Sequence, residues 1–113
     1  MKRFDIVTCD LPYTTETSRV LHGLHPAIVI SNDHVNTYSP VVTVIPMTSK
    51  MKRLDMPTHV PLNGFGLRKP SMALCEQLQS VDRDTIGHYI GTVDDPLVRH
   101  AIVRAVDVQL GAV

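Results

Sequence analysis

The chain has 113 residues and a mass of 12.5 kDa, which suffices for one domain with its own core but not for two. Eleven basic residues balance eleven acidic ones, so the net charge is zero and any nucleic-acid binding must come from a local basic patch. The sequence has no apolar run of the ~20 residues that span a bilayer and no closely spaced cysteines, and its first residues lack the apolar stretch expected of a signal peptide. We therefore expect a cytoplasmic protein with reduced thiols at Cys9 and Cys75.

The N-terminal half of the chain predicts three strands. Residues 4–11 alternate loosely in hydropathy, and residues 25–30 and 41–47 are β-branched apolar runs, which are typical of buried strands. Residues 12–24 form a long polar loop, of a length that is often functional in a small domain. Residues 31–33 carry N-cap chemistry, which predicts about one helical turn between the second and third strands.

The C-terminal half predicts three further strands and a helix. Residues 58–62 contain a proline and are preceded by another, which favours an edge strand. Residues 71–81 are predicted to form one bent strand, residues 82–87 a short helical turn, and residues 88–93 the last strand.

The C-terminal helix is marked at both of its ends. Asp94, Asp95 and Pro96 are typical of a helix start, and Gly111 is typical of its end. Spacing of three to four residues predicts a packing face of Leu97, Ala101, Val103 or Ala105, Val108 and Leu110. The predicted fold class is mostly β, a small or half-open barrel with a C-terminal helix, and the predicted domain is the single unit 1–113.

Polar side chains at the ends of two predicted strands form the candidate site. His25 begins one strand, and Thr48 and Ser49 end the next, where a rigid sheet can hold them in place. A basic cluster over residues 50–53 follows, although charge runs of this kind are usually solvated loops. His22 and His25 have a zinc-ligand spacing without a third clustered ligand, so we expect no metal and no other cofactor.

Five blocks along the chain carry a family resemblance: residues 5–7, 25–33, 44–49, 57–62 and 74–83. In this order they resemble the MazF/PemK family of toxin endoribonucleases of type II toxin–antitoxin systems. The resemblance covers nearly the whole chain. It implies an SH3-like barrel, a homodimer, metal-independent cleavage of single-stranded RNA, and an antitoxin whose C-terminal tail occupies the RNA groove.

The resemblance also implies the site residues. The family usually carries an arginine where this chain has His25, and that arginine acts at the scissile phosphate with a hydroxyl matched here by Thr48. An imidazole moves protons well near neutral pH but is only a single-point donor, whereas an arginine holds a phosphate by two contacts. Arg19, in the preceding loop, is the predicted replacement cation. The residues implied to bind RNA are Arg19, Ser49, Lys50, Lys52, Arg53, Glu76 and Gln77.

Three functional hypotheses follow. The first is a toxin endoribonuclease that cuts single-stranded mRNA by transesterification, leaves 2′,3′-cyclic phosphate and 5′-hydroxyl ends, and is neutralised by an antitoxin. The second is a catalytically weakened relative that serves as an RNA- or antitoxin-binding module, because His25 replaces arginine. The third is a gyrase inhibitor resembling CcdB, which is disfavoured because residues 110–113 include no aromatic side chain.

Overall fold

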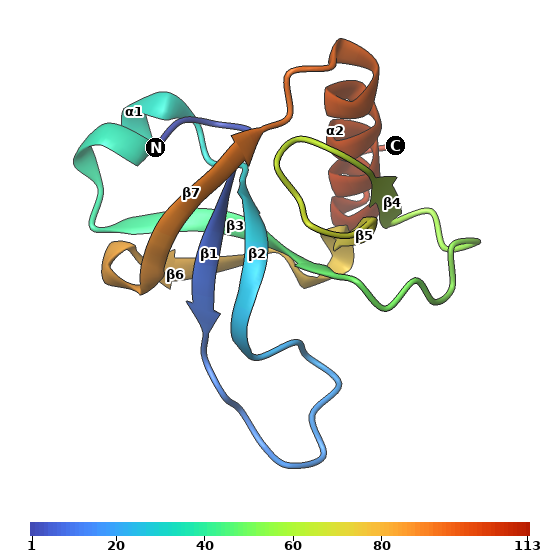
Figure 1. The fold of residues 1–113 in the computed structure, drawn as a ribbon, viewed down its shortest axis with the longest axis horizontal. Coiled ribbons are helices and arrows are strands. Elements are labelled where there is room, and N and C mark those ends of the chain that lie inside the picture. Colours follow the sequence, from blue (N-terminus) through green and yellow to red (C-terminus); the bar gives the residue numbers. More distant parts are fainter.

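The computed structural model describes residues 1–113 as a seven-stranded antiparallel sheet that curves into a half-open barrel, with a C-terminal helix packed at one end (Figure 1). The strands are β1 (Asp5–Leu11), β2 (Gly23–Val29), β3 (Val41–Thr48), β4 (His59–Leu62), β5 (Ser71–Leu74), β6 (Gln79–Asp82) and β7 (Ile86–Thr92). The helices are α1 (Asp33–Tyr38) and α2 (Pro96–Leu110), with short 3-10 turns η1 (Cys75–Gln77) and η2 (Arg83–Thr85). The predicted mostly β fold with a C-terminal helix is confirmed.

The sheet is organised around β3. Its strand order is β4-β5-β3-β2-β1-β7, and β6 pairs with β3 outside this path. The first half of β3 pairs with β6 and its last two residues pair with β5, while β2 lies along its other edge. The C-terminal end of β3 is therefore held by its pairing with β5. The predicted edge position of β4 is confirmed, since only β5 pairs with it.

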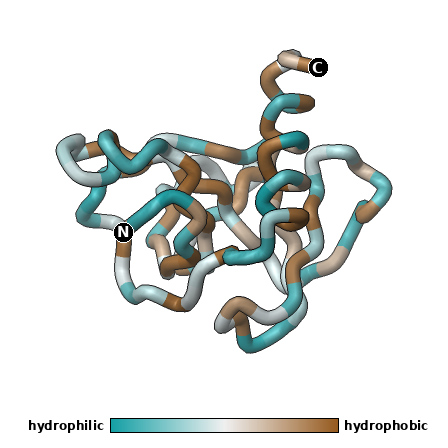
Figure 2. The backbone as a smooth tube through the Cα atoms, turned by 90° about the horizontal axis from the view of Figure 1, so that it is seen from above, coloured by the Kyte–Doolittle hydropathy of each residue, from teal (hydrophilic) through white to brown (hydrophobic).

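Successive side chains along each strand point to opposite faces of the sheet, and the apolar ones form two cores, one on each face. The larger cluster includes Ile28, Ile45 and Ile102 of α2, and the smaller one includes Ala27 and Val44. Figure 2 shows the corresponding change between apolar and polar segments along the backbone. A register slip of one residue would exchange the two faces, so this pattern fixes the pairing of the strands.

The predicted bent strand over residues 71–81 is wrong in detail. The chain forms β5, turns through η1 and then forms β6. The backbone N–H of Cys75 still donates to the carbonyl of Thr58 (3.0 Å), which extends the pairing of β5 with β4 by one position. The chain then turns at η1, where the N–H of Leu78 donates to the carbonyl of Cys75 (3.4 Å). The other limits also shift: β2 begins at Gly23 and β7 at Ile86, so His25 lies within a strand instead of at its start.

The ends of α2 are confirmed, but of its predicted packing face only Ala105 is buried. The Asp95 carboxylate accepts from the first N–H groups of the helix, and Gly111 ends it in a left-handed conformation (φ 73°). Leu97 and Leu110 are 81% and 66% exposed, however, and Ala101 is exposed as well. The buried positions are Ile102 and Ala105. The helix carries apolar residues on more than one side, and the side with these two residues faces the core. None of the helices is long and apolar enough to cross a membrane.

Replacing Ile102 with valine tests this helix face. Ile102 is completely buried, so loss of one methylene should lower the free energy of unfolding by about 1 kcal/mol. Leu97→Ala on the same helix should change it by less than about 0.5 kcal/mol, since Leu97 is exposed. Urea unfolding of both variants measures the difference. A larger loss for Leu97→Ala would contradict the packing described above.

Candidate functional site

A cavity of about 570 Å³ lies where the ends of β2 and β3 meet the loop between β4 and β5. His25 and the segment 48–50 line it from β2 and β3, and Arg68 and Lys69 line it from the loop. His88 of β7 also borders the cavity. No aspartate or glutamate lines this space, while three cationic side chains do, so the cavity suits an anion.

The strand register brings His25 and Thr48 to one face of the sheet. The pairing of β2 with β3 ends at Ala27 and Pro46, and His25 and Thr48 each lie two residues beyond this last pair on the same side of their strands. Opposite residues of antiparallel strands point to the same side and are near neighbours. The two residues that the sequence singles out as catalytic therefore border one cavity from adjacent strands.

A local hydrogen bond orients the His25 ring. Its Nε2 lies 2.9 Å from the carbonyl oxygen of His22. A carbonyl oxygen can only accept, so this contact assigns the hydrogen of the neutral ring to Nε2 and leaves Nδ1 as an acceptor. The ring therefore has one nitrogen available to take a proton.

The Thr48 hydroxyl also makes a hydrogen bond within the fold. Its hydroxyl oxygen accepts a hydrogen bond from the backbone N–H of Lys50 (3.1 Å), a local contact of the kind common after strands. The hydroxyl hydrogen has no partner of its own in this contact and can be donated to a ligand oxygen. Thr48 thus keeps one donor for an anion.

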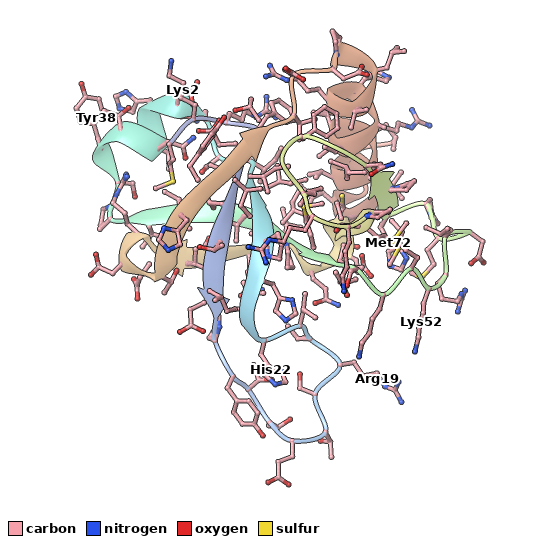
Figure 3. The ribbon with its side chains drawn as sticks, viewed as in Figure 1. Lys2, Arg19, His22, Tyr38, Lys52 and Met72 are labelled. Carbon is pink, nitrogen blue, oxygen red and sulfur yellow. The ribbon has the colours of Figure 1, made fainter.

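Several of the predicted RNA-binding residues do not line the cavity. Arg19 and Lys52 lie on two peripheral loops (Figure 3). Arg53 pairs with Asp55 at 3.2 Å, and its guanidinium holds the pKa of that carboxyl below its usual value. Of the predicted basic residues, Lys50 alone contributes to the cavity, together with Ser49.

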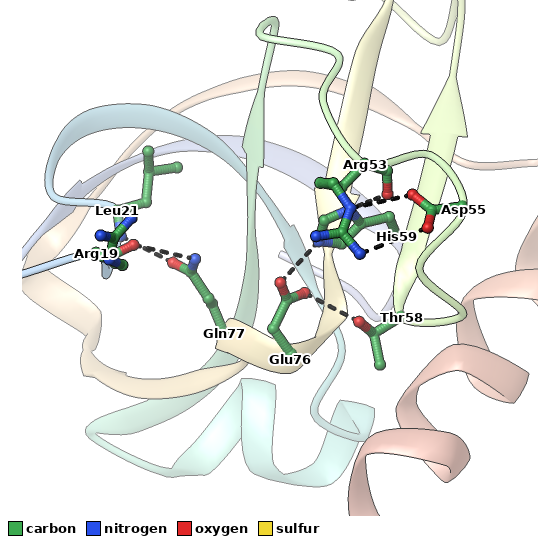
Figure 4. A network of polar contacts seen from close by, with 8 residues as sticks. All are labelled: Arg19, Leu21, Arg53, Asp55, Thr58, His59, Glu76 and Gln77. Atoms are coloured by element: carbon green, nitrogen blue, oxygen red, sulfur yellow. Dashed lines mark hydrogen bonds and ion pairs between the residues drawn. The ribbon is translucent and has the colours of Figure 1, made fainter.

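Glu76 belongs to a polar network next to β4 (Figure 4). One carboxylate oxygen accepts from His59 Nε2 at 2.7 Å, and the other accepts from the Thr58 hydroxyl at 3.3 Å. His59 Nδ1 lies 2.8 Å from the carbonyl oxygen of Arg53, so both ring nitrogens face oxygen acceptors. This network ties the loop after β3 to η1.

Gln77, also in η1, makes a second set of hydrogen bonds to a loop. Its side-chain oxygen accepts from the backbone N–H of Leu21 at 2.8 Å, and its amide nitrogen donates to the carbonyl of Arg19 at 3.5 Å (Figure 4). These contacts hold the long loop between β1 and β2 against η1. Glu76 and Gln77 are engaged in internal contacts and lie outside the cavity lining.

Sequence reasoning did not single out Arg68, Lys69 and His88 for the site. The pair at 68–69 follows a glycine-rich turn, and a basic pair in a loop is an ordinary solvated feature. Only the way this loop folds back toward β7 brings the pair to the cavity. His88 carries no local signal that separates it from any other histidine in a strand.

The two cysteines are buried and free, and neither lies in the cavity. Burial raises the pKa of the Cys75 thiol to about 12, with a smaller contribution from the Glu76 carboxylate, and burial also raises that of Cys9. No group of three or more His, Cys, Asp or Glu side chains is arranged to hold a metal ion. His22 instead packs edge-on against Tyr13, with ring centroids 5.0 Å apart.

Two proteins of known activity are similar over most of this sequence. Endoribonuclease MazF of Staphylococcus saprophyticus is 29% identical over 113 residues, which covers 98% of this chain and 92% of that protein. Endoribonuclease EndoA of Bacillus subtilis is 29% identical over 100 residues, which covers 87% of this chain and 84% of that protein.

Solved structures share the fold at lower identity. MazF from Deinococcus radiodurans superposes with a TM-score of 0.81 at 20% identity, covering 98% of this chain and 96% of that one. An endoribonuclease in complex with its cognate antitoxin, from Mycobacterial species, has a TM-score of 0.80 at 23% identity, covering 98% and 95%. The model of the PemK-like, MazF-like toxins matches residues 2–110. The chain therefore belongs to the family of PemK-like, MazF-like toxins of type II toxin–antitoxin systems.

Proposed function

We propose that residues 1–113 act as a single toxin domain, a homodimeric endoribonuclease that cuts single-stranded mRNA without a metal. Family membership and the names of the two endoribonuclease relatives support the activity. The observation that carries the assignment of the site is that His25 of β2 and Thr48 of β3 line one cavity that is free of carboxylates. A polyanion can enter such a cavity without repulsion.

In the proposed reaction His25 is the general base. Its Nδ1 takes the proton of a ribose 2′-hydroxyl, and the 2′-oxygen forms a bond to the adjacent phosphorus. The bond from phosphorus to the 5′-oxygen breaks, and this oxygen takes a proton from solvent in the open cavity. The products are a 2′,3′-cyclic phosphate and a 5′-hydroxyl end.

Thr48 and Lys50 stabilise the charge that develops on the phosphate. The Thr48 hydroxyl donates to a non-bridging oxygen, and Lys50 adds a positive charge from the same segment. The imidazolium formed at His25 stays beside the phosphorane and offsets part of its charge. Ser49 lies between the two residues and contacts the bound strand.

An antitoxin is the proposed regulator of this site. A mycobacterial structure of the same fold is an endoribonuclease in complex with its cognate antitoxin. We expect the C-terminal tail of an antitoxin to cover the cavity and so to exclude RNA. An acidic tail would match the cationic lining.

The activity can be tested with purified protein and a long single-stranded RNA in the presence of EDTA. Discrete cuts with 5′-hydroxyl ends are expected, and Thr48→Ala should slow them roughly thirtyfold, because a hydrogen bond to a charged group is worth about 2 kcal/mol. Thr37→Ala, which removes a hydroxyl from α1 outside the cavity, is the matched control.

Three outcomes would count against this assignment. Cleavage that requires Mg²⁺ would contradict the metal-free mechanism. Cleavage by Thr48→Ala at the wild-type rate would remove Thr48 from it. RNA binding without any cleavage by the folded protein would support the alternative of a weakened family member that acts as a binding module, with His25 in place of arginine as the cause.

A further inference from the structure

None of the residues assigned so far to the proposed site is a cation that can bind a phosphate by two hydrogen bonds. His25 is a single-point donor whose Nε2 is already bonded to the His22 carbonyl. Arg19, the replacement predicted from sequence, does not line the cavity, and Arg53 is paired with Asp55. Arg68 does line it, and its guanidinium enters neither of the two salt bridges in the protein.

The loop that carries Arg68 is fixed by close backbone contact with β7. Figure 1 shows this yellow-green segment, residues 63–70, beside the end of β7. A Cβ atom on Gly66 would overlap the carbonyl oxygen of Ile90, and one on Gly91 would overlap that of Phe65. The two backbones therefore touch reciprocally, and only glycine fits at either position.

Further contacts keep the loop in one conformation. Gly64 and Gly66 have φ angles of 96° and 88°, which glycine adopts without strain. The backbone N–H of Leu67 donates to the carbonyl of Gly64 (2.9 Å), and the Ser71 hydroxyl donates to the carbonyl of Lys69 (3.0 Å). These bonds bracket Arg68 on both sides, so its backbone is held while its side chain is exposed at the cavity.

We propose that Arg68 binds an RNA phosphate in this cavity and that the contact between Gly66 and Gly91 positions it there. A guanidinium offers two parallel N–H donors that match two phosphate oxygens. Arg68 would thus provide the two-point phosphate contact that the imidazole of His25 cannot make. The inference rests on the proposed function, because it assumes that RNA is the ligand of the cavity.

Binding of an RNA that cannot be cleaved tests the proposal separately from catalysis. The probe is a short, fluorescently labelled single strand of mixed sequence with 2′-O-methyl groups, and its dissociation constant is measured over a series of salt concentrations. Arg68→Gln should weaken binding about tenfold and lower the slope of log K against log salt by about 0.7, as expected for one lost phosphate contact on a single strand.

Three variants complete the test. Arg68→Lys should keep the wild-type salt slope, since the charge remains, but bind about threefold more weakly. Gly91→Ala should reproduce the loss seen in Arg68→Gln with the arginine still present, because it displaces the loop. Arg104→Gln removes an exposed arginine from α2 outside the cavity and should leave both quantities unchanged.

Binding by Arg68→Gln equal to that of Arg104→Gln would overturn the proposal, and so would a folded wild-type protein that does not bind the probe. Arg68 is exposed, so its variant is expected to fold even if Gly91→Ala does not. Binding that depends on Arg68, without cleavage of unmodified RNA, would refute the proposed activity and leave this inference standing. Cleavage of unmodified RNA by Arg68→Gln at the wild-type rate would refute this inference and leave the proposed activity standing.

Discussion

Replacing His25 with alanine is expected to lower kcat for RNA cleavage about a thousandfold, because a positioned general base contributes between ~10² and ~10⁴ in rate. The imidazole lines the same cavity as Thr48 and presents Nδ1 as an acceptor. Single-turnover cleavage of a labelled RNA measures the effect across a range of pH. The limb of the pH–rate profile that belongs to this base should disappear.

His34→Ala is the matched control, since His34 is exposed on α1 and does not line the cavity. His25→Arg distinguishes the two hypotheses about the natural histidine. Faster cleavage by His25→Arg would mark the wild-type enzyme as weakened by its histidine. Wild-type rates in His25→Ala would rule out the proposed mechanism.

Replacing Glu76 with alanine is expected to lower the free energy of unfolding by about 2 kcal/mol and to leave RNA affinity unchanged. The His59 side chain is only 7% exposed, and without the carboxylate its Nε2 would have no partner. The Glu76 side chain is 26% exposed, so water replaces part of the lost contact, and a buried nitrogen left without a partner costs about 1–3 kcal/mol. Urea unfolding measures the stability, and the uncleavable RNA probe measures the affinity.

Glu16→Ala, in the exposed loop between β1 and β2, is the matched control and should change stability by less than about 0.5 kcal/mol. The opposite pattern would be informative as well. If Glu76→Ala left stability intact but weakened RNA binding, Glu76 would belong to the RNA interface, as the family resemblance implies.

Local signals predicted most of the fold. The β-branched runs produced β2 and β3, and Asp95, Pro96 and Gly111 marked both ends of α2, because capping depends on residues that are neighbours in sequence. The break between β5 and β6 was not predictable in this way. It depends on pairing with distant strands, because β5 pairs with β4 and with the end of β3, whereas β6 pairs with the first half of β3.

The site was predicted as far as the strands determine it. His25 and Thr48 belong to adjacent strands and line one cavity, and the motif blocks pointed to both. Arg68 could not be found from sequence, because its place depends on the contact between Gly66 and Gly91 across the fold. Arg19 was a reasonable candidate, but the path of a long loop is set by ties such as Gln77 to Leu21.

The buried thiols have a consequence for how this protein behaves under oxidative stress. Hydrogen peroxide reacts with a thiolate, and a cysteine with a pKa of about 12 is ionised in only about one molecule in 10⁵ at pH 7. Cys75 sits at the start of η1, directly before the network that ties two loops together. Because Cys75 is also completely buried, we expect it to resist sulfenic acid formation and this junction to be spared by oxidants that act on exposed thiols.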